Sequence, residues 1–141
     1  MQTAELLPLI ESLTHPPVIE LADSLSPEVR DDLMNALRHL GFHVFAIRLS
    51  GRQANFEALL IEELDHGFRF PDYFGENWNA VDECINDLSW LPATGYCFFL
   101  STLGSVSAHS ASVMKLLLTV VADASAQWAQ NGRRFCVVVE R

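Results

Sequence analysis

The sequence predicts an α/β protein, a small parallel sheet of three to four strands packed against helices. Short apolar runs rich in β-branched and aromatic residues alternate along the 141-residue chain with longer segments whose apolar residues recur at helical spacing. Strands separated by helices of this length favour right-handed crossovers and a parallel sheet. The length of the chain suits a single domain over residues 1–141.

The N-terminal part of the chain predicts a helix, a short strand and a second helix. The Pro16–Pro17 pair ends the first helix, and "VIEL" (18–21) is typical of a short strand. Ser26 is expected to cap the second helix, with Pro27 at its first position, and Gly41 to end it. The residues expected on the apolar faces of the two helices are Leu6, Leu9, Ile10 and Leu13, then Val29, Leu33, Leu37 and Leu40.

The rest of the chain predicts three strands and three helices. In order, we expect a strand at 42–51, helices at 55–66 and about 77–88, a strand at 96–100, a helix at 108–130 and a strand at 135–140. The β-branched run in "FCVVVE" is the clearest strand signal. The helix at 55–66 is expected to bury Phe56, Leu59, Leu60 and Leu64. The helix at 108–130 is expected to bury Val113, Leu116, Leu117, Val120, Val121, Ala124 and Trp128.

The negative charge is concentrated in one segment. Residues 62–87 have a net charge of −7 out of −9 for the whole chain, because eight acids accompany the single base Arg69. Such a patch repels nucleic acid and anionic membranes and attracts a cationic partner by long-range steering. We therefore expect a basic protein partner, with no direct nucleic-acid or membrane partner.

Other sequence features suggest a cytoplasmic protein with reduced thiols. No apolar run approaches the roughly 18–20 residues of a membrane span. The N-terminus has no basic region and carries Glu5 and Glu11 within its apolar pattern, which is unlike a secretion signal. Cys84, Cys97 and Cys136 are widely spaced without a CxxC motif, which is typical of buried free thiols rather than a disulfide framework or a zinc site.

The most informative stretch is "PDYFGENWNAVDECIND" (71–87), which has five acids and no base. Its helix is expected to place Trp78, Val81, Cys84, Ile85 and Leu88 against the core and Asn79, Asp82, Glu83 and Asn86 on the outer face. Glu83 and Asp87 repel each other at i, i+4 at a cost of about 0.2–0.5 kcal/mol, near a helix C-terminus that disfavours anions. Segments that break local rules in this way are often functional.

The preceding loop offers a second indication. Gly75 is expected to let the backbone turn or be approached closely, and Asn77 to cap the helix. Tyr73 and Phe74 are neighbours, so in an extended stretch one faces the core and the other faces outward. A tyrosine facing outward is a common interface anchor.

This stretch resembles the binding loop and second helix of the barstar family of ribonuclease inhibitors. The P-[DE]-Y-[YF]-G-E-N core, followed by an acidic helix with a cysteine on its inner face, carries the resemblance. In outline it covers residues 42–141 and leaves 1–41 as an N-terminal extension. The resemblance implies a barstar-like fold and an immunity protein that inserts its loop and acidic helix into the cationic active site of a ribonuclease toxin.

The resemblance also implies the contact residues. Tyr73, Gly75 and Asn77 match loop positions of the family. Asn79 and Glu83 stand where the family has helix aspartates, and Asp82 stands where it has an interface tryptophan. The implied partner is a basic ribonuclease or toxin protein, and the free chain is expected to be a monomer. Glu76 and Asp87 are expected to set the electrostatic potential at the rim of the binding surface. The expected partner-binding residues are therefore Tyr73, Gly75, Glu76, Asn77, Asn79, Asp82, Glu83 and Asp87.

Three alternatives remain open at this point. The acidic face can be an ordinary solvated helix surface, with Gly75 and Asn77 serving only the turn and the cap. The same scaffold can bind a basic partner that is not a nuclease. A metal-dependent enzyme built on the carboxylates is disfavoured, because the five histidines show no metal-ligand spacing and no glycine-rich phosphate loop is present. No catalytic residue, metal site or cofactor is therefore expected.

Overall fold

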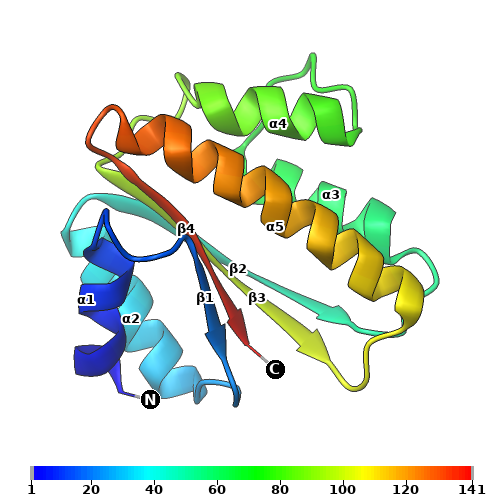
Figure 1. The fold of residues 1–141 in the computed structure, drawn as a ribbon, viewed down its shortest axis with the longest axis horizontal. Coiled ribbons are helices and arrows are strands. Elements are labelled where there is room, and N and C mark those ends of the chain that lie inside the picture. Colours follow the sequence, from blue (N-terminus) through cyan, green and yellow to red (C-terminus); the bar gives the residue numbers. More distant parts are fainter. Residues whose placement is uncertain (1, 141) are drawn as a thin grey trace.

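The computed structural model describes residues 2–140 and shows a four-stranded parallel sheet with helices on both faces (Figure 1). The strand order is β1-β4-β3-β2. The α/β prediction is confirmed, and the sheet has the larger of the two expected strand numbers. In chain order the elements are α1 (Thr3–Glu11), β1 (Val18–Leu21), α2 (Pro27–His39), β2 (Phe42–Ser50), α3 (Phe56–Phe68), α4 (Trp78–Asp87), β3 (Gly95–Leu103), α5 (Ala108–Ala129) and β4 (Arg134–Glu140).

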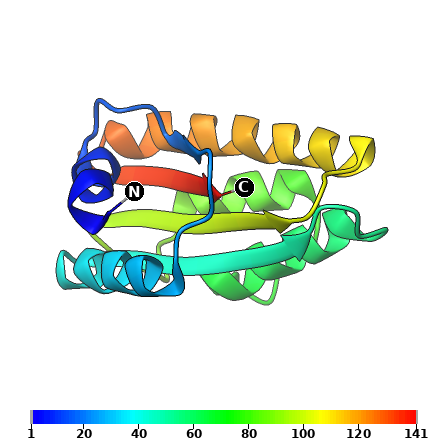
Figure 2. The same ribbon diagram turned by 90° about the horizontal axis from the view of Figure 1, so that it is seen from below.

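The helices divide between the two faces of the sheet, and each side has its own apolar core. One core joins α3, α4 and α5 to residues such as Phe98 and Val137, and the other joins α1 and α2 to their strand neighbours Phe99 and Val138. Figure 2 shows α5 running along the length of the sheet, with β3 between β4 and β2. Because strand side chains alternate between faces, the central strands β3 and β4 serve both cores.

Two elements extend beyond the predicted ranges. β3 begins at Gly95 and ends at Leu103, because it pairs with β2 along nine residues, including the polar Ser101 and Thr102. Pairing in a central strand thus overrides the weak strand signal of these side chains. α3 continues to Phe68 through Gly67, where a Cβ atom would overlap the Phe45 ring.

Three leucines expected in the core are exposed instead. Leu13 is 46% exposed because α1 has already ended at Glu11, and Leu40 is 44% exposed at the C-cap of α2. Leu116 is 40% exposed on the outer side of α5, next to the buried Leu117. The apolar spacing continues two residues beyond the end of α1 and one residue beyond the end of α2, and on α5 it predicts a buried stripe wider than the one observed.

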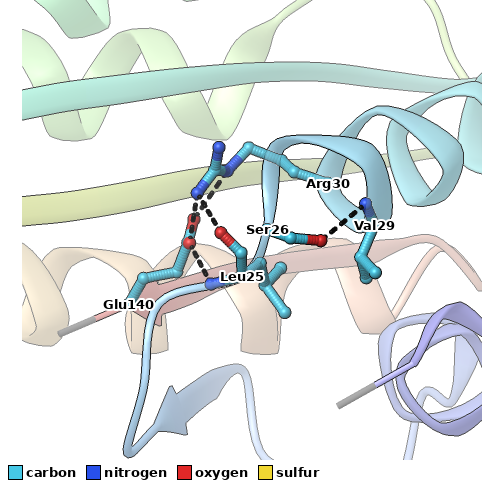
Figure 3. Close-up of polar contacts among 5 residues, drawn as sticks. All are labelled: Leu25, Ser26, Val29, Arg30 and Glu140. Carbon is cyan, nitrogen blue, oxygen red and sulfur yellow. Dashed lines mark hydrogen bonds and ion pairs between the residues drawn. The ribbon is translucent and has the colours of Figure 1, made fainter.

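The N-terminal segment is anchored at both ends of β4. The Arg134 guanidinium, buried beside the end of α1, donates to the carbonyls of Leu9, Ile10, His15 and Pro16 at 2.8–3.2 Å. At the other end of the strand, the buried Glu140 carboxylate lies against the start of α2 (Figure 3). β1 adds parallel pairing to β4 along Val18–Leu21. Residues 2–41 are therefore joined to the sheet by backbone pairing, packing and charge.

The three cysteines are the buried free thiols that the sequence predicts. Cys84, Cys97 and Cys136 are buried and form no disulfide. Burial raises the pKa of the fully enclosed Cys97 thiol, so this side chain remains a neutral core residue. Across residues 2–140 we find no helix of the length and apolarity needed to cross a membrane.

His43 gives the fold a pH dependence that can be measured. Its half-buried ring has Nε2 2.6 Å from the Gly67 carbonyl oxygen, so Nε2 carries the proton and donates. Burial lowers the pKa of His43 from its ordinary value of 6.5. The unfolded chain therefore gains this proton first as pH falls, and the stability from neutral His43, complete above pH 6.5, is lost below it.

We expect the free energy of unfolding in urea to fall between about pH 7.5 and about pH 5.5. His43→Gln keeps an amide donor for the Gly67 carbonyl but cannot titrate, so its fall should be smaller. All other titratable groups are the same in both proteins. The difference between their two curves of unfolding free energy against pH therefore gives the contribution of His43. Equal falls would show that His43 does not contribute.

Candidate functional site

The loop at 71–77 is held by aromatic packing beneath it. Phe74 turns inward and lies 4.6 Å, between ring centroids, from Phe70, which in turn packs on Phe68 and on Trp90. Tyr73 points the other way and is 74% exposed. The expected division of the two neighbours is thus confirmed, and the outward member is the tyrosine.

Asn77 fixes the junction between the loop and α4. Its Oδ1 accepts from the Ala80 backbone N–H at 2.8 Å, and its Nδ2 donates to the Gly75 carbonyl at 3.1 Å. The predicted N-cap is therefore present. The left-handed residue of the turn is Glu76, with φ of 54°, and not Gly75, so the expectation that the turn depends on this glycine's freedom is wrong. Gly75, Glu76 and Asn77 are all exposed.

The inner side of α4 matches the prediction with one difference. Val81, Cys84 and Ile85 are buried, and the C-cap Leu88 joins them. Trp78 is only half-buried. Burial and the neighbouring Glu83 carboxylate raise the pKa of the Cys84 thiol, which therefore stays protonated in the core.

The predicted outer face of α4 separates into two surfaces. Asn79, Glu83 and Asp87 are exposed and project to solvent. Asp82 and Asn86 are half-buried on the side toward α5, because the helix lies alongside α5 rather than flat on the sheet (Figure 1). The Asn86 side-chain amide donates to the Asp82 backbone carbonyl at 2.7 Å and to the Asp82 carboxylate at 3.2 Å. Asp82 thus faces a groove, and Glu83 faces solvent.

The groove between α4 and α5 has a volume of ≈560 Å³ and a polar lining. Trp128 forms its floor and donates from Nε1 to the Ile85 carbonyl at 2.8 Å, which links the two helices. The buried Asn86 Oδ1 has no hydrogen-bond partner. The polar side chains that line the groove are Asp82, Asn86, Asp123, Gln127 and Asn131.

Sequence reasoning missed the α5 side of this groove. Asp123, Gln127 and Asn131 recur every four residues, which places them along one side of the helix and its exit. That spacing was the available signal, but only the packing of α4 on α5 shows that the stripe faces Asp82. The groove adds a carboxylate, Asp123, to the acidic surface.

In the part of the chain that the structure describes, no basic side chain pairs with the acids of this surface. Within residues 2–140, no Lys or Arg nitrogen lies within 4.0 Å of the carboxylates of Asp82, Glu83 or Asp87. No set of three His, Cys, Asp or Glu side chains in the same range is arranged to hold a metal ion. We call Tyr73, Glu76, Asn79, Asp82, Glu83, Asp87 and Asp123 the acidic surface. Within residues 2–140 it combines carboxylates that have no basic partner with one exposed aromatic ring, that of Tyr73.

Comparison with known proteins identifies the family. No curated protein and no solved structure matches the chain significantly. The family model described as Barstar (barnase inhibitor) matches residues 44–140, which include the loop, all of α4, β3 and β4, and most of β2. This match covers more than half of the chain, and the first 43 residues lie outside it. The chain therefore belongs to the barstar family, whose members are inhibitors.

Proposed function

We propose that this protein is a cytoplasmic immunity protein that binds a basic ribonuclease toxin and occludes its active site with the acidic surface. The observation that carries the proposal is the exposed Glu83 carboxylate, which has no basic partner among residues 2–140, together with the exposed Tyr73 ring in the loop before α4. The family match supports an inhibitor of the barnase-inhibitor kind. The free protein is proposed to be a monomer, with residues 1–141 as a single domain.

The chemistry of a ribonuclease explains why such a surface would inhibit it. A ribonuclease holds phosphates, so its cleft is lined with cationic side chains. Carboxylates on a rigid helix can occupy the same positions and exclude RNA, and complementary charge speeds the encounter. The Asn77 cap and the bond from Trp128 to Ile85 hold α4 in place, so little entropy is lost on binding.

The positions of the side chains suggest different roles. Glu83 and Asp82 would engage the cationic centre, Glu83 directly and Asp82 from the groove. Tyr73 and Asn79 would frame it, together with the loop backbone at Gly75 and Asn77. Asn77 contributes mainly through its cap, since both ends of its amide already bind backbone atoms. Glu76 and Asp87 would set the potential at the rim.

The proposal is tested by capturing the partner and assaying it. The tagged chain is incubated with an extract of its native cells, and the eluted partner is tested on a fluorogenic RNA. We expect RNA cleavage that stops when the purified chain is added back. A retained basic protein that does not cleave RNA would contradict the proposal and favour the alternative, a barstar-fold module for a basic partner that is not a nuclease.

Glu83→Ala should weaken binding of the captured ribonuclease by at least about 2 kcal/mol, the loss typical of a hot-spot residue. The Glu83 side chain is exposed on α4 and makes no hydrogen bond within residues 2–140, so its removal should leave the fold intact. Isothermal titration calorimetry measures the change. Glu11→Ala, an exposed acid on α1 across the sheet, is the matched control and should bind normally. Unchanged affinity for Glu83→Ala would remove this residue from the interface.

A further inference from the structure

A second cavity, with a volume of ≈520 Å³, lies at the carboxyl ends of the strands. Residues from β1, β3, β4, the loop after β3 and the first half of α5 line it. This volume is within the range of pockets that hold small molecules. The side chains that the argument uses are Glu20, Thr102, Met114, Lys115, Leu118 and Val139.

The topology of the sheet explains why the chain leaves this space open. The connection after β1 leads to α2 on one face, whereas the connection after β3 leads to α5 on the other. β4 lies between these two strands (Figure 1). Where connections depart to opposite faces at the carboxyl ends of parallel strands, a crevice forms, and this is where open α/β sheets bind ligands.

The lining combines apolar walls with two isolated opposite charges. Met114 and Leu118 from α5 face Val139 from β4. Glu20 and Lys115 are exposed at the cavity, and neither side chain makes a hydrogen bond or ion pair within residues 2–140. Lys115 is the only lysine of the sequence. Unused charges beside apolar walls indicate a ligand with both polar and apolar parts.

The charges select among the possible ligands. A simple anion would meet Glu20 and a chain of net charge −9, and a simple cation would meet Lys115. A zwitterion satisfies both groups. We propose that this cavity binds a small zwitterion with an apolar body, the chemistry of a free amino acid with a large aliphatic or aromatic side chain. Its carboxylate pairs with Lys115, its ammonium group pairs with Glu20, and its side chain lies between Met114 and Leu118.

This cavity is separate from the acidic surface. The two linings share no residue. On α5 the cavity lining ends at Leu118 and the groove lining begins at Asp123, about 7.5 Å further along the helix axis, and the charged Lys115 lies about 20 Å along that axis from Trp128. The inference does not depend on the proposed inhibition of a ribonuclease. It can be tested on the isolated protein without any partner.

The test is a titration of the ¹⁵N-labelled protein with L-leucine, L-methionine and L-phenylalanine, followed by two-dimensional NMR. We expect saturable shifts of the amides from Gly104 to Val106 and from Ala111 to Leu118. Lys115→Gln should raise the dissociation constant about threefold to tenfold, the value of one charge-assisted hydrogen bond at a partly exposed site. Arg38→Gln, which removes an exposed cation from α2, is the matched control and should leave it unchanged.

Ligand analogues test the zwitterion itself. N-acetyl-L-leucine lacks the ammonium group and L-leucinamide lacks the carboxylate, so each should bind more weakly than L-leucine. Lys115→Gln should narrow the difference between L-leucine and L-leucinamide. The proposal is overturned if none of the three amino acids gives saturable shifts, if Lys115→Gln binds as tightly as the native chain, or if either analogue binds as well as L-leucine.

Discussion

Arg30→Met is expected to reduce the free energy of unfolding by about 3–5 kcal/mol, the usual cost of removing one partner from a buried ion pair. Glu140 is fully buried, and its carboxylate accepts from Arg30 Nε at 3.0 Å and from Arg30 Nη2 at 2.5 Å (Figure 3). The Leu25 backbone N–H donates a further bond at 2.9 Å. Without the guanidinium, this carboxylate must remain charged without a cation or take up a proton.

The loss should extend beyond the pair. Arg30 Nη2 also donates to the Leu25 carbonyl at 3.1 Å, so the guanidinium fixes the turn that leads into α2. The bond to Glu140 raises the pKa of Arg30, so the guanidinium stays charged in the folded protein. Removal of Arg30 therefore weakens the docking of α2 and exposes the core beneath it.

Urea denaturation at neutral pH measures the effect. The double variant Arg30→Met/Glu140→Gln has no charge left at this pair, so it should recover a substantial part of the loss, since an amide oxygen can still accept from the Leu25 N–H. Asp31→Asn, at an exposed position on the same helix, controls for a change of charge on α2. A loss below about 1 kcal/mol for Arg30→Met would show that water reaches and solvates the Glu140 carboxylate.

Phe68→Ala is expected to cost about 3–5 kcal/mol, the range for removing a fully buried phenylalanine. The Phe68 side chain is 1% exposed at the end of α3. Its ring meets the Phe45 ring edge-on, with 4.8 Å between the ring centroids. It also packs on the rings of Phe70, Phe98 and Phe135, whose centroids lie 5.7–5.9 Å away. The alanine variant leaves a cavity at the point where these rings converge.

This variant also tests whether the loop depends on the core. Phe68 supports Phe70, and Phe70 supports Phe74 in the binding loop. Urea denaturation should show the loss of stability, and NMR should show broadened loop signals in the folded protein. Phe68→Leu keeps most of the volume and should cost about 1–2 kcal/mol. A Phe68→Ala protein with native stability would contradict the central position of this ring.

The sequence predicted the order and type of the elements because each has a strong local signal. β4 contains an unbroken apolar run from Phe135 to Val139, and Ser26 and Asn77 cap helices where expected, since an N-cap is a contact over three residues. The length of β3 could not be predicted, because its last residues are strand only through pairing with β2. Leu13 and Leu40 were placed in the core because periodicity does not mark the residue at which a helix ends.

The sequence predicts which residues of α4 belong to the site, but it does not predict the residues of α5 that lie opposite them. The exposure of Asn79 and Glu83 follows from helical spacing. The exposure of Tyr73 follows because its neighbour Phe74 turns inward. Asp123 comes 41 residues after Asp82, and only the packing of two helices brings both to one groove. A side chain that reaches its partner through tertiary contact leaves no signal in the local pattern.

The position of β4 in the sheet sets an order for folding on the ribosome. β1 pairs with β4 alone, with Val18 opposite Val137, so the earliest strand waits without a partner while more than a hundred further residues are synthesised. Contacts so distant in sequence form slowly, because a long loop must close first. The nascent chain can assemble β2, β3 and the helices that pack on them, including α2, but β1 and the part of the α1–α2 core that lies against Cys136 and Val138 stay uncovered until β4 emerges. That interval is when the nascent protein most needs a chaperone.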